Sequence, residues 1–307
     1  MDKKRLAQFA SAAAKTILFG EHAVVYGQPG IAIPLPSLRA FAALIDGSED
    51  DGFRIVSKSI GLNAPPDALP ETHPQRKLLE LLSQRFGKSL PRNGRLEIES
   101  SIPVAAGLGS GAAVSVAIIR AFSRRFELSP DEEEVSELAF EIEKIYHGAP
   151  SGIDNTVIAY EQPIFYTRGQ PARPIRSNWQ LPILIADTGI QASTIDIVAS
   201  VRHAYPGNKP IIDAIGSISR RAAAAIHENR IDEIGALMNE NQRLLQELNV
   251  SCGPLNRFLA IARRAGALGA KLTGAGRGGN FVVLARNDAE KKTIAEKLTR
   301  AGAIVRL

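Results

Sequence analysis

The order of apolar and polar positions predicts a chain in which strands and helices interleave. Residues 96–100 alternate apolar and polar side chains, the period of a half-buried strand, so we predict a strand at 95–102. The residues after 111 are mostly small or apolar at helical spacing. The same patterns predict further strands at 15–19, 31–43 and 53–56 and further helices at 75–86 and 131–146. Because these elements lack the regular spacing of a doubly wound parallel sheet, we predict an α+β fold.

The later part of the chain predicts a second domain. A strand at 182–186 follows a polar connection at 168–179, and long helical patterns then cover 195–204, 211–229 and 231–248. A helix at 254–264 and a buried strand at 281–284 follow. We therefore predict two domains, residues 1–180 and 181–307. Within the first, prolines at 65, 66, 70 and 74 predict that 63–74 is a loop without regular structure.

Composition limits the classes of function. Hydrophobic residues make up 45% of the 307 positions and charged residues 22%, as in a globular protein with a packed core. The sequence has no run of about 18 apolar residues, so we expect no membrane-spanning helix, and polar residues at 8, 11 and 15 argue against a cleaved signal peptide. The single cysteine, Cys252, excludes an internal disulfide and a cysteine zinc cluster. A cytoplasmic protein is the resulting expectation.

The net charge of +5 raises the question of nucleic-acid binding. The basic residues are scattered as single residues and pairs, no basic run follows Arg5, and Trp179 is the only tryptophan. We therefore expect neither a nucleic acid nor a membrane as partner. A positive surface of this kind is expected to attract anionic small molecules.

A glycine-rich segment between a predicted strand and a predicted helix is the most informative local feature. Residues 103–113 read PVAAGLGSGAA. Gly107, Gly109 and Gly111 let the backbone turn sharply and approach a ligand. The first turn of the following helix offers unpaired N–H groups and the positive end of the helix dipole, so we predict a phosphate ligand. The segment is neither a P-loop nor the dinucleotide fingerprint, and a tight connection within a packed domain is the alternative interpretation.

Two other loops combine glycines with ionisable residues. Residues 20–27 place Glu21 and His22 directly after a predicted strand that begins with Lys15. A solvated loop with a chance histidine is the alternative there. Residues 271–280 form a second glycine-rich loop before a buried strand. Such a loop allows close approach of the backbone, either to a ligand or to the other glycine-rich loop.

Two carboxylates stand at positions suited to catalysis. Pro150 and Gly152 form a rigid turn, and Asp154 lies on or just after it, where a catalytic group can be aimed. A helix N-cap is the alternative role for this aspartate. Glu143 falls at the edge of the apolar stripe of the preceding helix, so it can reach a cleft and act as a magnesium ligand. The other glutamates of that helix are expected to be solvated.

Together, these segments resemble the signature motifs of the GHMP kinase superfamily, which includes galactokinases, homoserine kinases, mevalonate kinases and phosphomevalonate kinases. The resemblance extends from about residue 11 to 284, and segments 21–27 and 147–155 resemble the mevalonate kinases in particular. It implies a two-domain α+β fold with the active site in the cleft between the domains. It also implies ATP-dependent phosphorylation of the 5-hydroxyl of mevalonate, in isoprenoid precursor biosynthesis.

The resemblance further implies roles for individual residues. Asp154 matches the catalytic aspartate, which accepts or orients the proton of the attacking hydroxyl, and Lys15 matches the lysine that partners it. Glu143 matches the carboxylate that holds Mg²⁺. The positions that match residues facing mevalonate are Glu21, His22 and Thr194. The positions that match the cradle for the ATP phosphates are Ala105, Ala106, Gly107, Leu108, Gly109, Ser110 and Gly111.

Three residues depart from the pattern of these kinases. Gly111 stands where the family has a second serine whose hydroxyl joins the Mg²⁺ shell, so either Ser110 or water is expected to replace that ligand. Ala192 stands where animal mevalonate kinases have an arginine aimed at the substrate, which leaves the partner of the substrate carboxylate open. Arg277 interrupts a run of glycines and would add positive charge near the phosphates.

Other functions remain as alternatives on the sequence alone. One is another kinase of the same superfamily, acting on phosphomevalonate or a sugar, and the other is a nucleotide-binding regulator without enzymatic activity. The presence of both Lys15 and Asp154 argues against a decarboxylase relative and against a pure binding module. A homodimer is compatible with the sequence but not specified by it, and feedback inhibition by isoprenoid diphosphates is equally unspecified.

Overall fold

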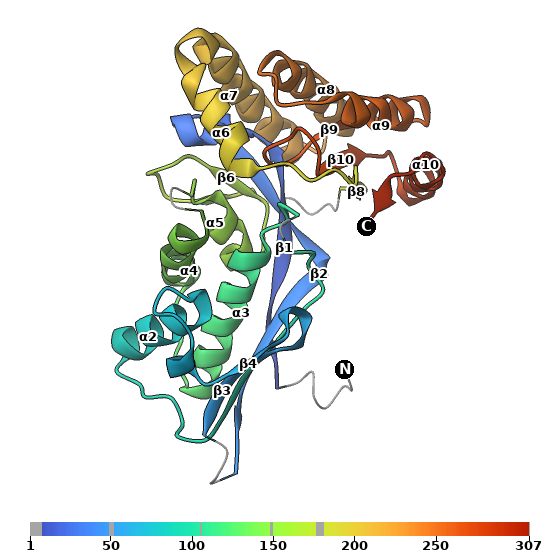
Figure 1. Cartoon of the computed structure of the whole chain (residues 1–307). Coiled ribbons are helices and arrows are strands. Elements are labelled where there is room, and N and C mark those ends of the chain that lie inside the picture. Colours follow the sequence, from blue (N-terminus) through green and yellow to red (C-terminus); the bar gives the residue numbers. More distant parts are fainter. Residues whose placement is uncertain (1–7, 49–51, 105, 148–149, 176–180, 307) are drawn as a thin grey trace. The chain divides into compact units, whose positions relative to one another are not determined.

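The computed structural model describes residues 8–48, 52–104, 106–147, 150–175 and 181–306, and it contains both helices and sheets (Figure 1). The chain divides into two compact units. The first comprises Met1–Lys15 and Pro34–Gln162, and the second comprises Thr16–Ile33 and Pro163–Leu307. The long strands β1 (Ala10–Phe19) and β2 (Gly30–Asp46), which pair with each other, contribute residues to both units. The predicted α+β class is confirmed.

In the first unit, strands pair in the order β4–β3–β5–β2. The central strand β5 (Gly94–Ser100) is antiparallel to β2, with Ala40 opposite Ser100, and parallel to β3 (Phe53–Ser57). Strand β4 (Leu62–Ala64) pairs antiparallel with β3. Short 3₁₀ turns at Lys58–Ile60 and Pro66–Ala68 flank β4.

The helices of the first unit lie together on one side of its strands (Figure 1). They are α2 (Pro74–Phe86), α3 (Ser110–Arg125), α4 (Glu132–His147) and α5 (Ile153–Tyr160). Helix α3 is the most deeply placed, since it contacts α2, α4, α5 and β5. Its buried side chains include Val116, Ile119 and Phe122, and burial of each contributes roughly 1.5–3 kcal/mol. The core of this unit therefore fixes the helix that follows the glycine-rich loop.

In the second unit, an antiparallel sheet has the strand order β11–β8–β10–β9. Every residue of β10 (Asn280–Leu284) is buried, and Phe281 lies opposite Ala186 of β8 (Ile183–Asp187) and Leu272 of β9 (Gly269–Leu272). Strand β11 (Ile304–Val305) pairs with β8. The short strands β6 (Ile164–Tyr166) and β7 (Arg173–Pro174) continue from β2, with β6 paired to its first residues.

The helices of the second unit are α6 (Thr194–His203), α7 (Tyr205–His227), α8 (Ile231–Glu247), α9 (Gly253–Arg264) and α10 (Asp288–Arg300). Helices α8 and α9 pack on β9, and α7 contacts both α8 and the 3₁₀ helix Ala23–Tyr26. In the part of the chain that the structure describes, no helix has both the length and the apolar character that a bilayer crossing requires.

Most predicted elements are confirmed within a few residues, but the prediction for 63–74 is wrong in part. Asn63 and Ala64 belong to β4, because pairing with β3 overrides the local proline signal. Pro66 begins a 3₁₀ turn, a position that tolerates proline. Helices α5 and α10 and the short strands β6, β7, β9 and β11 were not predicted as elements.

The compact units do not coincide with the predicted domains. Residues 16–33 group with the C-terminal half of the chain, and the unit boundary at Gln162 precedes residue 180. Residues 176–180, including Trp179, lie outside the described residues. The division into 1–180 and 181–307 therefore stays a prediction about the family's domains.

Candidate active site

The first unit contains an ion pair between Lys15 of β1 and Asp154 of α5. The Nζ atom of Lys15 lies 2.8 Å from Oδ2 of Asp154. The lysine side chain is only 4% exposed, whereas the aspartate side chain is 27% exposed. The pair is thus closed on the lysine side and open on the carboxylate side, where a ligand can reach Asp154.

The start of α5 holds Asp154 in place through its neighbours. Gly152, with φ 91°, is the N-cap residue, so Asp154 lies in the first turn and the alternative that it is the cap is wrong. The buried Asn155 donates hydrogen bonds to the carbonyl and hydroxyl oxygens of Ser136 on α4, at 3.0 and 2.9 Å. Thr156 donates to the carbonyl of Gly152 at 2.6 Å. Sequence reasoning assigned no role to Asn155, although an amide next to Asp154 at the start of an apolar helix was the available signal.

The glycine-rich loop lies directly against Lys15. Leu108 is fully buried, and its carbonyl accepts a hydrogen bond of 3.0 Å from the Lys15 N–H. Gly109 has φ 74°, and an added Cβ there would lie 2.8 Å from Cδ1 of Ile158 and 2.9 Å from Cγ of Lys15. Only glycine fits this position. Helix α3 then begins at Ser110, so its unpaired first-turn N–H groups lie beside the ion pair. Ala105 lies outside the described residues.

Glu143 of α4 approaches the same first turn of α3. It is 2% exposed, and a Cβ added at Gly111 would lie 3.2 Å from its Oε1 atom and 3.1 Å from Cε2 of Tyr146. Burial and, to a smaller extent, the negative charge of Asp154 raise the pKa of Glu143 to about 7, although the positive charge of Lys15 opposes the rise. The Tyr146 ring thus occupies the space next to Gly111 that a serine side chain would enter.

The carboxylates in this unit fit a divalent cation. Glu143 is a buried carboxylate, and the negative charge of Asp154 contributes to its raised pKa, so a bound cation would interact favourably with both groups. Among the residues described, no cluster of three or more His, Cys, Asp or Glu side chains could hold a metal. Mg²⁺ needs no such cluster, because one or two carboxylates together with substrate phosphates suffice.

The second unit contains His22, which has an uncommon backbone conformation. Its φ of 61° lies in the left-handed region, which non-glycine residues seldom adopt. Its Nε2 atom lies 3.0 Å from the Ala275 carbonyl, which can only accept, so Nε2–H donates and Nδ1 of the neutral ring is left as an acceptor. Burial lowers the pKa of His22 despite that hydrogen bond, and the charges of Lys271 and Arg277 lower it further.

A second ion pair joins Glu21 to Lys271 of β9. Both side chains are fully buried, and Nζ of Lys271 donates to Oε1 of Glu21 and, at 2.7 Å, to the Leu272 carbonyl. Burial lowers the pKa of Lys271, and the neighbouring Glu21 charge opposes that change. Sequence reasoning assigned no role to Lys271. A lone charge in an otherwise apolar run before a glycine-rich loop was the signal that could have found it.

The remaining candidate residues of this unit lie at the start of α6 and in the second glycine-rich loop. Thr194 is the exposed first residue of α6, and the exposed Ala192 lies two residues before it. The Arg277 guanidinium donates to the carbonyl of Asn249 at 3.0 Å and to the hydroxyl of Ser200 on α6 at 3.3 Å. Arg277 therefore links its loop to the helix that begins at Thr194. Its predicted proximity to the phosphates stays a prediction.

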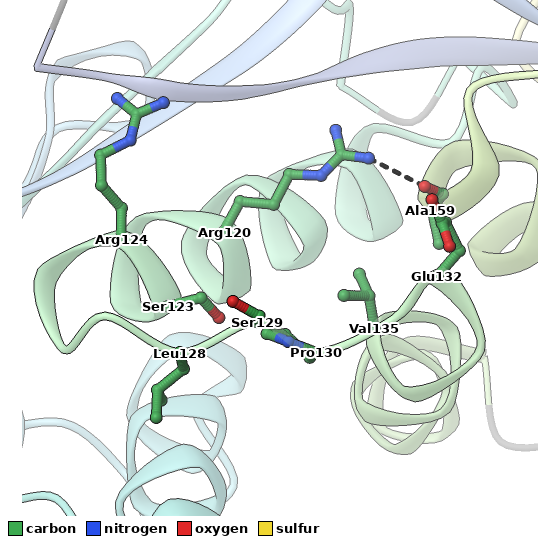
Figure 2. A pocket seen from close by; sticks show the side chains of 9 residues that line it. All are labelled: Arg120, Ser123, Arg124, Leu128, Ser129, Pro130, Glu132, Val135 and Ala159. Atoms are coloured by element: carbon green, nitrogen blue, oxygen red, sulfur yellow. Dashed lines mark hydrogen bonds between the residues drawn. The ribbon is translucent and has the colours of Figure 1, made fainter.

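A separate cavity of about 300 Å³ lies in the first unit, between α3 and the start of α4 (Figure 2). None of the candidate residues lines it. Figure 2 shows the Arg120 guanidinium directed at the Ala159 carbonyl, to which it donates at 2.8 Å, and the same group donates to the Ser11 carbonyl and to Glu161. Its cation is therefore already committed to protein oxygens. The lining residues are Arg120, Ser123, Arg124, Leu128, Ser129, Pro130, Glu132, Val135 and Ala159.

Comparison with protein families gives two matches on this chain. The model of the GHMP kinases N terminal domain matches residues 75–162, and the model of the GHMP kinases C terminal domain matches residues 222–304. The first match includes the glycine-rich loop, Glu143 and Asp154.

Individual proteins resemble the chain over nearly its whole length. A mevalonate kinase of Pyrococcus horikoshii is 36% identical, with 96% of this chain and 93% of that protein covered. A mevalonate kinase of Thermococcus sibiricus is 39% identical, with 96% and 94% covered. The crystal structure of L. major mevalonate kinase in complex with R-mevalonate superposes with a TM-score of 0.79 at 31% identity, covering 95% of this chain and 91% of that one.

Proposed function

This chain belongs to the GHMP kinase family, and we propose that it transfers the γ-phosphoryl group of ATP to the 5-hydroxyl of (R)-mevalonate, giving 5-phosphomevalonate and ADP. Among its relatives, those named mevalonate kinase match it over nearly the full length. The observation that carries the proposal is the Lys15–Asp154 pair beside the N-terminus of α3. A carboxylate open to a hydroxyl and a helix end that attracts phosphate are the parts that this reaction needs.

We assign the proton transfer to Asp154. Its carboxylate, open on one side, takes the proton of the attacking primary hydroxyl and orients that oxygen toward the phosphorus. Lys15 holds the carboxylate in one orientation and contributes positive charge where charge develops on the transferred group. Asn155 and Thr156 keep the start of α5 fixed, so the carboxylate is positioned before substrate binds.

We assign phosphate binding to the loop 105–111 and the first turn of α3. The backbone N–H groups there supply hydrogen bonds to phosphate oxygens, and Gly109 lets the loop approach Lys15 closely. Glu143 and Ser110 are the residues that would hold Mg²⁺. When bound, the ion would neutralise charge on the β- and γ-phosphates.

We assign mevalonate binding to the segment containing Glu21 and His22 and to Thr194. The neutral His22 ring offers Nδ1 as an acceptor for a substrate hydroxyl, and Thr194 is exposed at a helix start. Because the side chain of Ala192 carries no charge, we assign no residue of this chain as the partner of the substrate carboxylate. We place the activity in the cytoplasm, as part of isoprenoid precursor biosynthesis, with no nucleic-acid or membrane partner.

A coupled assay of ADP release tests the proposal. The purified protein, with ATP and Mg²⁺, would be offered mevalonate, phosphomevalonate, galactose and homoserine in turn, with Asp154→Asn as the background control. We expect kcat/KM for mevalonate to exceed the others by about 10³-fold or more, since kinases discriminate by binding differences of several kcal/mol. Faster turnover of another substrate, or no turnover of any, would contradict the proposal.

A further inference from the structure

We propose that Lys271 is a positioning residue for substrate binding: its buried ion pair with Glu21 holds the 20–27 segment against the second glycine-rich loop and so fixes the His22 imidazole. This inference rests on the proposed function for the identity of the ligand. It concerns a residue to which neither the sequence motifs nor the family resemblance gave a role.

The Lys271–Glu21 pair joins two segments that are far apart in the sequence. Lys271 is the second-last residue of β9, and the carbonyl of the last residue, Leu272, accepts the second hydrogen bond of the ammonium group. Glu21 begins the turn that leads into the 3₁₀ helix Ala23–Tyr26. Both charged groups are fully buried, so their mutual attraction offsets part of the cost of removing each of them from water. The pair therefore fixes the separation and register of the two segments.

Other contacts place the same two segments against each other. Thr273, two residues after Lys271, donates from its hydroxyl to the Ile17 carbonyl at 3.0 Å and accepts from Thr16 at 2.9 Å. Within the second loop, the Ala275 carbonyl accepts from His22. Lys271 adds a charged group to these contacts of Thr273 and Ala275. It lies near the end of β9, just before the second glycine-rich loop.

The conformation of His22 explains why such a tie is needed. A histidine at φ 61° has a backbone conformation that non-glycine residues seldom adopt, and it persists only where surrounding contacts hold it. The adjoining backbone bonds, from Ala23 to the Glu21 carbonyl at 2.7 Å and from Val24 to the Gly20 carbonyl at 3.0 Å, belong to the turn that Glu21 anchors. Loss of the anchor is expected to release His22 toward ordinary backbone angles and to break its bond to Ala275. Nδ1 would then no longer be directed at one place.

The test uses the double variant Lys271→Met/Glu21→Gln. Both replacements keep side-chain size, and together they leave no unpaired buried charge, so the protein is expected to fold. The matched control is Arg221→Met/Glu240→Gln, which removes one exposed ion pair of the same unit. We expect the KM for mevalonate to rise about tenfold or more in the test variant and the KM for ATP to stay within about threefold of wild type. Because Glu21 itself belongs to the proposed mevalonate-binding segment, this rise supports the role of Lys271 only together with faster amide exchange in the same segment. The control should change none of these values.

Amide hydrogen exchange gives a readout that does not depend on activity. Exchange at Val24 and Val25, whose N–H groups bond to Gly20 and His22, should be about tenfold faster in the test variant and unchanged in the control. If the double variant does not fold, Glu21→Gln takes its place, since the buried lysine can shed its proton there.

The outcomes separate this inference from the proposed function. Unchanged exchange, or faster exchange with an unchanged KM for mevalonate, overturns the role of Lys271. Faster exchange together with the KM effect supports it. A wild-type protein that does not phosphorylate mevalonate contradicts the proposed function instead, and the exchange result alone then decides whether Lys271 holds His22.

Discussion

The two compact units each contain a buried lysine that is paired with a carboxylate, and these two pairs differ in what can reach them. In the first unit, Asp154 keeps 27% of its side chain exposed beside the buried Lys15. In the second, Lys271 and Glu21 are both fully buried. The same two charged groups therefore occur once as an open pair and once as a closed pair. An open carboxylate can exchange a proton with a ligand, whereas a closed one can only hold other groups in place.

The surroundings of the two pairs differ in the same way. Next to the open pair lie a glycine-rich loop, the start of α3 and the buried Glu143, which together suit phosphates and a cation. Next to the closed pair lie a backbone carbonyl and a histidine held by another carbonyl. Burial of the carboxylate, rather than the presence of a lysine partner, therefore distinguishes a group suited to chemistry from one that holds the structure together.

The largest effect is expected for Asp154→Asn. An amide cannot accept the hydroxyl proton, so kcat should fall by about 10³-fold or more, which corresponds to about 4 kcal/mol in the barrier. The affinity for ATP, measured by titration calorimetry, should stay near wild type. Asp288→Asn, in the exposed first turn of α10, is the control for loss of a helix-start charge. Near-normal kcat for Asp154→Asn would remove the distinction between the two pairs.

Next in size is the loss of stability in Lys271→Met. Removing Lys271 leaves the fully buried carboxylate of Glu21 without the positive charge of the lysine, and the free energy of unfolding should fall by about 3–5 kcal/mol. Lys15→Met should cost less, about 1–2 kcal/mol, because water reaches Asp154. Urea unfolding of the two variants under one set of conditions measures the difference. Equal losses would mean that the open pair is as dependent on its partner as the closed one.

A smaller effect concerns the pH dependence of stability through Glu143. Its pKa of about 7 in the folded protein exceeds the usual 4.5, so the native state binds the proton more tightly than the unfolded chain does. The contribution of protonated Glu143 to the free energy of unfolding has its full value below about pH 4.5 and is lost as the pH rises through about 7. With no cation bound, the free energy of unfolding should therefore fall by about 2 kcal/mol between pH 5 and 8.

Glu143→Gln should remove that slope, and urea unfolding across the pH range measures it. Glu137→Gln, on the exposed face of the same helix, is the control and should leave the slope as in wild type. Added Mg²⁺ with ADP should reduce the slope in wild type but not in Glu143→Gln. If the free energy of unfolding depends on pH in the same way in wild type and Glu143→Gln, ionisation of Glu143 does not affect the stability of the folded protein.

The smallest effect is expected for Gly111→Ser. The added Cβ would meet the Tyr146 ring at 3.1–3.2 Å and Oε1 of Glu143 at 3.2 Å, so neighbours must shift by a few tenths of an ångström. Such overpacking should cost about 1 kcal/mol of unfolding free energy. Tyr146→Ala in the same chain should recover part of that cost by making room. Gly253→Ser, where nothing lies within 4 Å of the added Cβ, should cost little.

Sequence patterns could predict those strands, helices and loops whose structure depends on residues close together in the chain. The pattern of apolar and polar positions placed the strand that carries Lys15 and the helix that carries Glu143, and the three glycines around Leu108 indicated a loop at a helix start. Asp154 was expected after a rigid turn, and it lies two residues after Gly152 in the first turn of α5. These features depend on local backbone geometry, which single residues specify.

Contacts between distant parts of the chain could not be predicted in this way. Glu21 and Lys271 are separated by 250 positions, so neither residue indicates its partner. The sequence of residues 20–27 is equally compatible with a solvated loop, so it does not indicate that Glu21 is buried against Lys271. Helix α10 buries only Ile294 and Leu298, too few apolar positions for a clear helical pattern. The grouping of 16–33 with the C-terminal half likewise depends on tertiary contacts.

The most direct test of the difference between the two pairs is kcat at saturating mevalonate and ATP in two folded variants, Lys15→Met and Lys271→Met/Glu21→Gln. We predict that kcat falls by about 100-fold or more when the open pair is broken, because charge on the transferred group loses its partner. When the closed pair is replaced by neutral side chains, kcat should stay within about threefold of wild type, since only the positioning of a binding group is lost. Two results would contradict the assignment of chemistry to the open pair and of positioning to the closed pair. One is a kcat that falls as far in the closed-pair variant as in Lys15→Met, and the other is a kcat of Lys15→Met that stays near wild type.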